Sequence, residues 1–166
     1  LVLLFSIPTV QTRLGKYATN RINKEFGTNI NIQKVGLQFN GDVELKEIYI
    51  EDFKKDTLIS IQELNTSVLS LRNFLNNKLT FGDIDIEGLV FNIVTYKDEI
   101  NTNLDIFVDK LDDGRPRKEE SDFLLSSTDV TISDARFKIT DQNKEHPAKL
   151  DFSCLNINAT EFAIQG

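Results

Sequence analysis

Three acidic residues of this sequence have a spacing that could support catalysis or metal binding. Asp83, Asp85 and Glu87 alternate along one segment, so on a β-strand they lie on one face about 7 Å apart. That separation suits the acid and base of a glycosidase or a weak calcium site. The same alternation is typical of the wet side of a half-buried strand, and we favour that interpretation.

Nucleophilic and metal-binding residue types are scarce. His146 is the only histidine and precedes Pro147 in a turn, which gives no oriented base for a catalytic triad. Cys154 is the only cysteine, so an internal disulfide and a multi-cysteine zinc site are excluded, and its apolar neighbours suggest a buried thiol. Without a glycine-rich phosphate loop as well, we expect no catalytic residue, no metal, no cofactor and no enzymatic activity.

The overall charge argues against nucleic acid as a partner. The net charge of −7 and the isoelectric point near 4.8 repel phosphate backbones. The 166 residues allow one domain or the end of a larger protein. Hydrophobic residues make up 40% of the chain, which is enough for a core.

The N-terminal region divides into an apolar segment and a basic one. Residues 1–8 are too short to cross a bilayer, and we interpret them as the end of a membrane anchor helix, with a signal peptide or a core strand as alternatives. Residues 9–27 predict an amphipathic helix with apolar residues every fourth position. Its basic residues suit contact with anionic headgroups. The stripe comprises Val10, Leu14, Ala18, Ile22 and Phe26, and Gly27 is expected to end the helix.

After residue 27 the apolar period changes from about four to two, which predicts β-strands. Asn40-Gly41 between two such runs predicts a hairpin. One apolar pattern with steps of two, three and two then recurs, for example at Val43, Leu45, Ile48 and Ile50. A step of three would turn the following residues to the other face, unless a β-bulge or a tight corner restores the face. The pattern therefore predicts one bent strand type that is used repeatedly, and both explanations of the bend stay open.

A second level of repetition predicts internal duplication. Similar strand openings at Asp42 and Asp129, and similar strand ends near Ile61 and Phe152, lie about 90 residues apart. We expect residues 28–166 to form the N-terminal β-groove region of a longer protein, with repeats at about 28–111 and 123–166. Segment 67–77 is expected to hold a short helix or a turn, and segment 103–111 a short helix with Asn103 as its N-cap. Segment 112–122 is expected to be a polar loop.

The predicted fold is mainly β. We expect an elongated, curved antiparallel or mixed β-sheet forming an open, taco-like groove, with an N-terminal helix and one or two helical insertions. Strands with one apolar face must bury it, either against each other in a closed sandwich, barrel or solenoid, or against an apolar ligand. The candidate groove-lining residues are Val43, Leu45, Ile48, Ile50, Ile84, Ile86, Leu89, Phe91, Val130, Ile132 and Phe137.

Several segments resemble the N-terminal region of TamB-like translocation and assembly module proteins of Bacteroidetes-type bacteria, in the AsmA/TamB family. They are 11–14 (QTRL), 26–32 (FGTNINI), 40–45 (NGDVEL) and 79–89 (LTFGDIDIEGL), and Asn103-Leu104-Asp105 fits a family loop that precedes an amphipathic segment. The resemblance implies a single-pass inner-membrane protein with a periplasmic body and a long hydrophobic groove. It also implies a role in phospholipid movement and outer-membrane protein assembly, with a BamA- or TamA-like partner bound through a C-terminal region that this sequence lacks.

Three functions remain as hypotheses. The first is a groove that conducts phospholipid toward the outer membrane, in which acyl chains contact the residues named above. The second is a structural β-solenoid or scaffold whose interior is filled by its own side chains. The third is a carbohydrate-active β-helix enzyme, for which only the carboxylate pair speaks.

Overall fold

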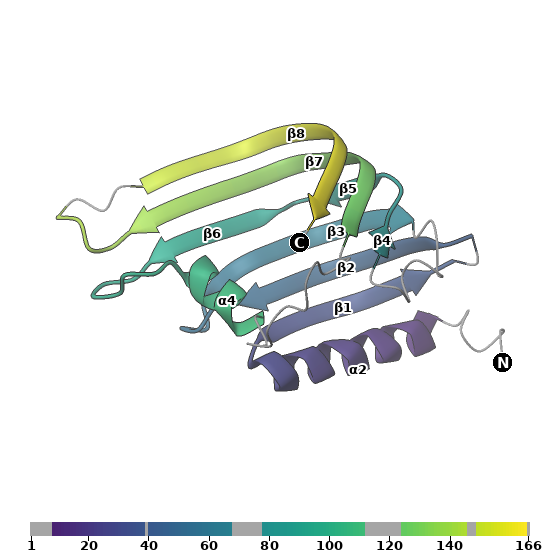
Figure 1. Cartoon of the computed structure of the whole chain (residues 1–166), viewed down its shortest axis with the longest axis horizontal. Helices are drawn as coiled ribbons and strands as arrows, with labels where there is room; N and C mark the ends of the chain where they lie inside the picture. The colour runs from purple at the N-terminus through teal and green to yellow at the C-terminus, as the bar shows by residue number, and fades with distance from the viewer. Residues whose placement is uncertain (1–7, 39, 68–77, 112–123, 146–148, 166) are drawn as a thin grey trace.

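The structure is a computed structural model that describes residues 8–38, 40–67, 78–111, 124–145 and 149–165. The predicted insertion at 67–77 and the polar loop at 112–122 therefore lie almost wholly outside the described residues. The elements in chain order are α2 (Pro8–Phe26), β1 (Asn29–Leu37), β2 (Asp42–Glu51), β3 (Thr57–Ser67), β4 (Lys78–Thr80), β5 (Ile84–Glu87), β6 (Val90–Thr95), α4 (Asn103–Leu111), β7 (Leu124–Asp141) and β8 (Lys149–Gln165). The predicted mainly β fold with an N-terminal helix is confirmed (Figure 1).

The eight strands form one mixed sheet. Strands β1, β2 and β3 pair antiparallel, as do β7 and β8. Gly41, at φ +95°, turns the chain between β1 and β2, which confirms the hairpin predicted from Asn40-Gly41. In the described part of the sheet, β1 pairs only with β2 and β8 only with β7, so these two strands lie at its edges.

Strands β4, β5 and β6 are consecutive pieces of one interrupted strand. All three pair in parallel with β7 at an unchanged register, in which Lys78 faces Leu124, Ile84 faces Val130 and Val90 faces Arg136. Strands β5 and β6 also both pair antiparallel with β3. The apparent branching of the sheet at this point therefore reflects a break in one strand.

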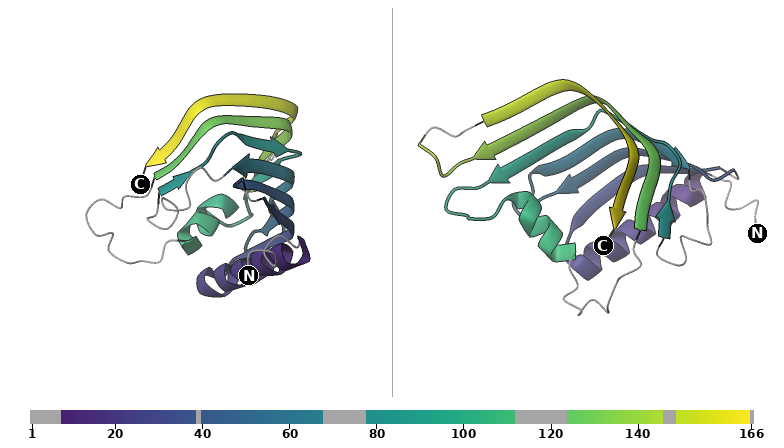
Figure 2. Two further views of the ribbon diagram at one scale, coloured as in Figure 1. Left: turned by 90° about the vertical axis from the view of Figure 1, so that its right-hand side faces the viewer. Right: turned by 45° about the horizontal axis from the view of Figure 1, so that its top comes forward.

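The strands bend together along one line across the sheet. Four residues on this line have a left-handed backbone: Glu47 at φ +52°, Gly88 at +65°, Asp134 at +51° and Cys154 at +55°. Each stands where the apolar pattern takes its step of three. Figure 2 shows the strands turning as a set, most sharply in β7 and β8.

The bend is a corner and not a bulge between β1, β2 and β3. Leu45 faces Leu64 on one side of Glu47, and Ile48 faces Ile61 on the other, so no residue is inserted in either strand. At the bend, the bulge alternative applies between β7 and β8, where the register shifts locally around Ala135 and then returns. A further shift between β2 and β3, at Ile50 and Glu51, lies away from the bend. Exposure along β1 alternates as the step of three requires, with Ile30, Ile32 and Val35 the more buried positions.

Helix α2 lies along the outer edge of β1 (Figures 1 and 2). Its side chains pair with the edge backbone as a neighbouring strand would. The Gln11 amide donates to Leu37 O at 2.6 Å and accepts from Leu37 N at 3.1 Å, and the Asn23 amide bonds both Ile30 O and Ile30 N at 2.8 Å. Gly15 allows the close approach, since a Cβ there would lie 2.4 Å from Val35 Cγ2. Ile22, from the predicted apolar stripe, is exposed instead.

The predicted location as a single-pass inner-membrane protein is contradicted. Among the residues that the structure describes, no helix combines the length and the apolar character needed to cross a bilayer. The predicted end of an anchor at 1–8 lies outside those residues except for Pro8.

Replacing Gly88 by alanine should lower the free energy of unfolding by about 1–2 kcal/mol, because a Cβ disfavours the left-handed backbone. That Cβ would also stand 2.5 Å from Cδ of Gln62. Asp134→Gly, at the equivalent point of the neighbouring strand, is the matched control and should not destabilise. Urea denaturation of both variants checks this, and an equal loss of stability in the two would contradict the corner.

Candidate apolar binding face

Two rows of apolar side chains cross the sheet from β1 to β8, one on each side of the bend. The first, which we call the Leu45 row, consists of mutually facing residues Val35, Leu45, Leu64, Ile86, Ile132 and Ile157. The second, the Phe91 row, consists of Ile30, Ile50, Ile59, Phe91, Phe137 and Phe152. At the usual strand spacing each row is about 24 Å long.

Ten of the eleven predicted lining residues lie on strands that share these rows, and Leu89 lies in the short break between β5 and β6. Six of them are row members: Leu45, Ile50, Ile86, Phe91, Ile132 and Phe137. Val43, Ile84 and Val130 flank the Leu45 row, where Ile84 faces Val130. Ile48 and Leu89 lie between the rows at the bend. The structure thus brings the predicted set onto contiguous strands, while ligand contact by these residues stays a prediction.

Burial of the rows falls toward the β8 edge. At the bend, Ile48 and Leu89 are each 8% exposed, and the other nine predicted residues are half-buried. On β8, Phe152 is 50% exposed and Ile157 39%. The Phe91 and Phe137 rings are in contact, with centroids 5.9 Å apart. The rows therefore combine core contacts at the bend with uncovered apolar surface at one edge.

The opposite face of β1, β2 and β3 carries a ladder of ion pairs. Lys46 Nζ lies 3.0 Å from Glu44 and 2.8 Å from Glu63, and Lys34 Nζ lies 3.1 Å from Glu44. Hydrogen bonds from Lys46 and Lys34 hold the pKa of Glu44 below its usual range, and Lys46 and Asn65 do the same for Glu63. Half-exposed pairs of this kind contribute little stability, so the ladder marks the water-facing side.

The carboxylates singled out in the sequence belong to this wet side. Asp85 and Glu87 are exposed and alternate with the half-buried Ile84 and Ile86. Asp85 faces Asn65, and Glu87 faces Glu63. Within the described parts of the chain, no group of three or more His, Cys, Asp or Glu side chains could hold a metal ion.

The other two candidates for chemistry offer no site. His146 lies outside the described residues. Cys154 is exposed, which corrects the expectation of a buried thiol. It occupies the left-handed corner of β8. In the described sheet β8 is an edge strand that pairs with β7 alone.

Helix α4 packs at one end of the sheet. Asn103 is 1% exposed and is not the N-cap that the sequence suggested. Its amide donates to Asp52 Oδ2 at 2.9 Å and Asn92 O at 3.1 Å, and accepts from Val94 N at 2.9 Å. Thr102 is the cap instead, because its hydroxyl accepts from Asp105 N. Near the other end of the helix, Lys110 Nζ donates to Gly27 O at 3.0 Å.

The contact between α4 and the β2–β3 turn centres on Asp52, which is only 6% exposed. Tyr96 donates to its carboxylate at 2.6 Å, and the backbone N–H groups of Lys54 and Asp56 also donate to it. Burial opposes ionisation, but these bonds and that of Asn103 outweigh it and hold the pKa of Asp52 below its usual value. Burial and the neighbouring carboxylates raise the pKa of Tyr96. No local pattern in the sequence predicts this long-range cluster.

Comparison with known proteins leaves the family open. No family model, curated protein or solved structure matches this chain. The resemblance to the AsmA/TamB family therefore stays a prediction.

Replacing Asn103 by alanine should cost about 2–4 kcal/mol of stability, because it leaves Asp52, Asn92 O and Val94 N each short of a buried partner. Asn101→Ala, two residues earlier and exposed, is the control and should change stability little. Urea denaturation followed by circular dichroism measures both. Similar losses in the two variants would contradict a specific role for Asn103.

Stability should fall in acid partly through Asp52. Because its pKa is lowered in the folded state, its stabilising effect is present above the ordinary aspartate pKa of about 4 and is lost as the pH falls below that value. The difference in unfolding free energy between the wild type and Asp52→Asn should be largest near neutral pH and shrink near about pH 3. A difference independent of pH would show that the Asp52 charge is not involved.

Proposed function

We propose that the face carrying the Leu45 and Phe91 rows binds the acyl chains of lipids, as part of an open β-groove. The observation that carries the proposal is the continuity of both rows across six strands, together with the exposure of their members on β8. Each CH₂ removed from water contributes about 0.8 kcal/mol, so contact with a few methylenes gives retention without a polar site. No catalytic side chain is needed.

The direction of the bend supports a concave lining. Lys46 and Glu47 are two consecutive residues on the polar side of β2, between the inward Leu45 and Ile48. Two consecutive residues on the polar side make the backbone path longer there than on the apolar side, as the outside of a corner requires. Glu47, Asp134 and Cys154 are all exposed there. Helix α4 lies under the arch of the sheet in Figure 2 and would close one end of such a groove.

The unequal treatment of the two edges supports continuation of the groove past β8. Side chains of α2 satisfy the outer edge of β1. The outer edge of β8 has no strand or helix against it among the described residues. Native proteins rarely leave a long apolar edge strand uncovered. Further strands added at β8 would extend both rows and give lipid a continuous track, in keeping with the N-terminal region of a long AsmA/TamB-type groove.

A self-filled scaffold is the second candidate, and the burial at the bend favours it. At the bend Ala135 is completely buried, and Ile48 and Leu89 nearly so. These residues form core contacts whatever the rest of the face binds. The two functions differ in whether the half-buried row members are available to a ligand.

Replacing Ile86 by arginine should remove most of the lipid that co-purifies with the protein, because a charge at the centre of the Leu45 row is costly beside an acyl chain. Native mass spectrometry of protein prepared without detergent measures the bound lipid. Asp85→Arg, the exposed neighbour on the wet side, is the matched control and should retain lipid.

The outcomes separate the two candidates. Lipid bound to the wild type and the Asp85 variant but not to a folded Ile86 variant supports the groove. A wild type free of lipid, or loss of folding in the Ile86 variant with no lipid on the others, supports the scaffold.

A further inference from the structure

Positive charge is concentrated on helix α2. Its 19 residues contain Arg13, Arg21, Lys16 and Lys24 and a single acid, Glu25. The whole chain has 19 basic and 26 acidic residues, so the remainder carries 15 basic against 25 acidic. A helix of charge +3 thus lies at the edge of a body of charge −10.

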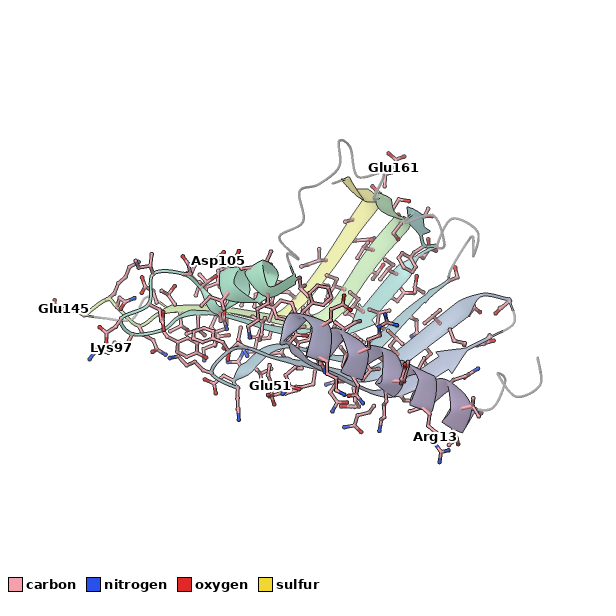
Figure 3. The ribbon with its side chains drawn as sticks, turned by 60° about the horizontal axis from the view of Figure 1, so that its bottom comes forward. Arg13, Glu51, Lys97, Asp105, Glu145 and Glu161 are labelled. Atoms are coloured by element: carbon pink, nitrogen blue, oxygen red, sulfur yellow. The ribbon has the colours of Figure 1, made fainter. Side chains whose placement is uncertain are left out.

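The positive charge points away from the sheet. Gln11, Thr12, Gly15 and Asn23 contact β1, which fixes the inner face of the helix. At 100° per residue, Arg13, Tyr17, Arg21 and Lys24 lie on the opposite face, and Lys16 lies on the flank of the helix near Asn23. We call these five residues the basic ridge. All five are exposed, Tyr17 by 69%. Figure 3 shows Arg13 directed away from the strands.

The ridge is electrostatically unsatisfied within the described chain. None of its four cations has an ion pair with a described acidic residue. Tyr17, Arg21 and Lys24, together with Asn20, line a shallow hollow of about 310 Å³. A phosphate group fits the chemistry of such a hollow, because guanidinium, ammonium and amide groups all donate to phosphate oxygens.

We propose that the basic ridge docks the protein on the surface of an anionic lipid bilayer. The ridge is straight and about 17 Å long, a shape that meets a flat surface along its length. Tyr17 near its middle suits the headgroup region, where tyrosine side chains concentrate. The acidic body repels an extended polyanion such as nucleic acid, whereas a flat bilayer meets the ridge alone. The inner face of α2 is held by β1, so docking is electrostatic and does not insert the helix.

Docking in this way orients the apolar rows. The rows run across the strands from β1 toward β8, and α2 lies along the β1 edge. With the ridge on the bilayer, the β1 ends of the rows are nearest the lipid and the β8 ends farthest away. This step rests on the proposed lipid-binding function, whereas docking itself does not.

Vesicle sedimentation at about 0.15 M salt tests the proposal, with phosphatidylcholine vesicles compared with vesicles that also contain phosphatidylglycerol. The wild type should bind only the anionic vesicles and be released at about 1 M salt, where screening reaches about 3 Å. Arg21→Gln/Lys24→Gln should bind roughly 25-fold more weakly, at about fivefold per cation. Lys55→Gln/Lys97→Gln removes the same charge from exposed positions off the helix and should stay within about twofold.

Several outcomes would overturn docking by the ridge: equal binding to neutral vesicles, equal loss in the two double variants, or binding of soluble polyphosphate that competes fully with vesicles. The Ile86→Arg variant keeps the failures distinct. If it sediments with anionic vesicles but retains no lipid, docking and the groove are separate and both stand. If the wild type retains lipid but does not sediment, docking is wrong and the groove stands.

Discussion

The shared bend is the constraint on which the rest of the sheet depends. Neighbouring strands are tied by backbone hydrogen bonds, so one strand cannot turn unless its neighbours turn at the same place. Glu47, Asp134 and Cys154 accept a left-handed backbone that costs about 1–2 kcal/mol for a residue with a side chain. The backbone hydrogen bonds to the strands on both sides hold these residues in that conformation. The pairing register of β1, β2 and β3 is therefore the same on both sides of the corner. The apolar residues beyond the corner face one another on successive strands.

The two edges of the sheet show how the same backbone groups are satisfied differently. At β1, glutamine, threonine and asparagine side chains of α2 replace a strand, so the edge can pair no further. These polar residues are on the face that packs on the sheet, where an amphipathic helix usually carries apolar ones. The arrangement leaves the basic residues outward, and the capping of the edge and the exposure of the ridge are consequences of one helix orientation.

The local parts of this structure could be predicted from the sequence, and the long-range parts could not. Steps of two predicted the strands, Asn40-Gly41 the first hairpin, and the step of three the position of the bend. The parallel pairing of β4, β5 and β6 with β7 has no local signal, since its partners lie 46 residues apart. Asn103 was mistaken for a cap because capping and burial in a tertiary cluster suit the same residue type. The prediction of a membrane anchor rested on residues 1–8. No helix among the described residues is long and apolar enough to cross a membrane.

Core and candidate binding surface lie on the same face of the sheet, at different distances from the bend. Ile48, Leu89 and Ala135 are buried where the corner folds the strands together, while Phe152, Ile157 and Leu150 on β8 remain 39% to 53% exposed. Apolar surface costs about 25 cal/mol per Å² when it stays in water. Phe152 and Ile157 face the half-buried Phe137 and Ile132 on β7, and Leu150 faces Ile139, which is itself exposed. Covering these side chains would therefore be favourable. Bound lipid, as proposed, and additional strands would both cover them, and the two are compatible, since each added strand would lengthen the surface on which an acyl chain could lie.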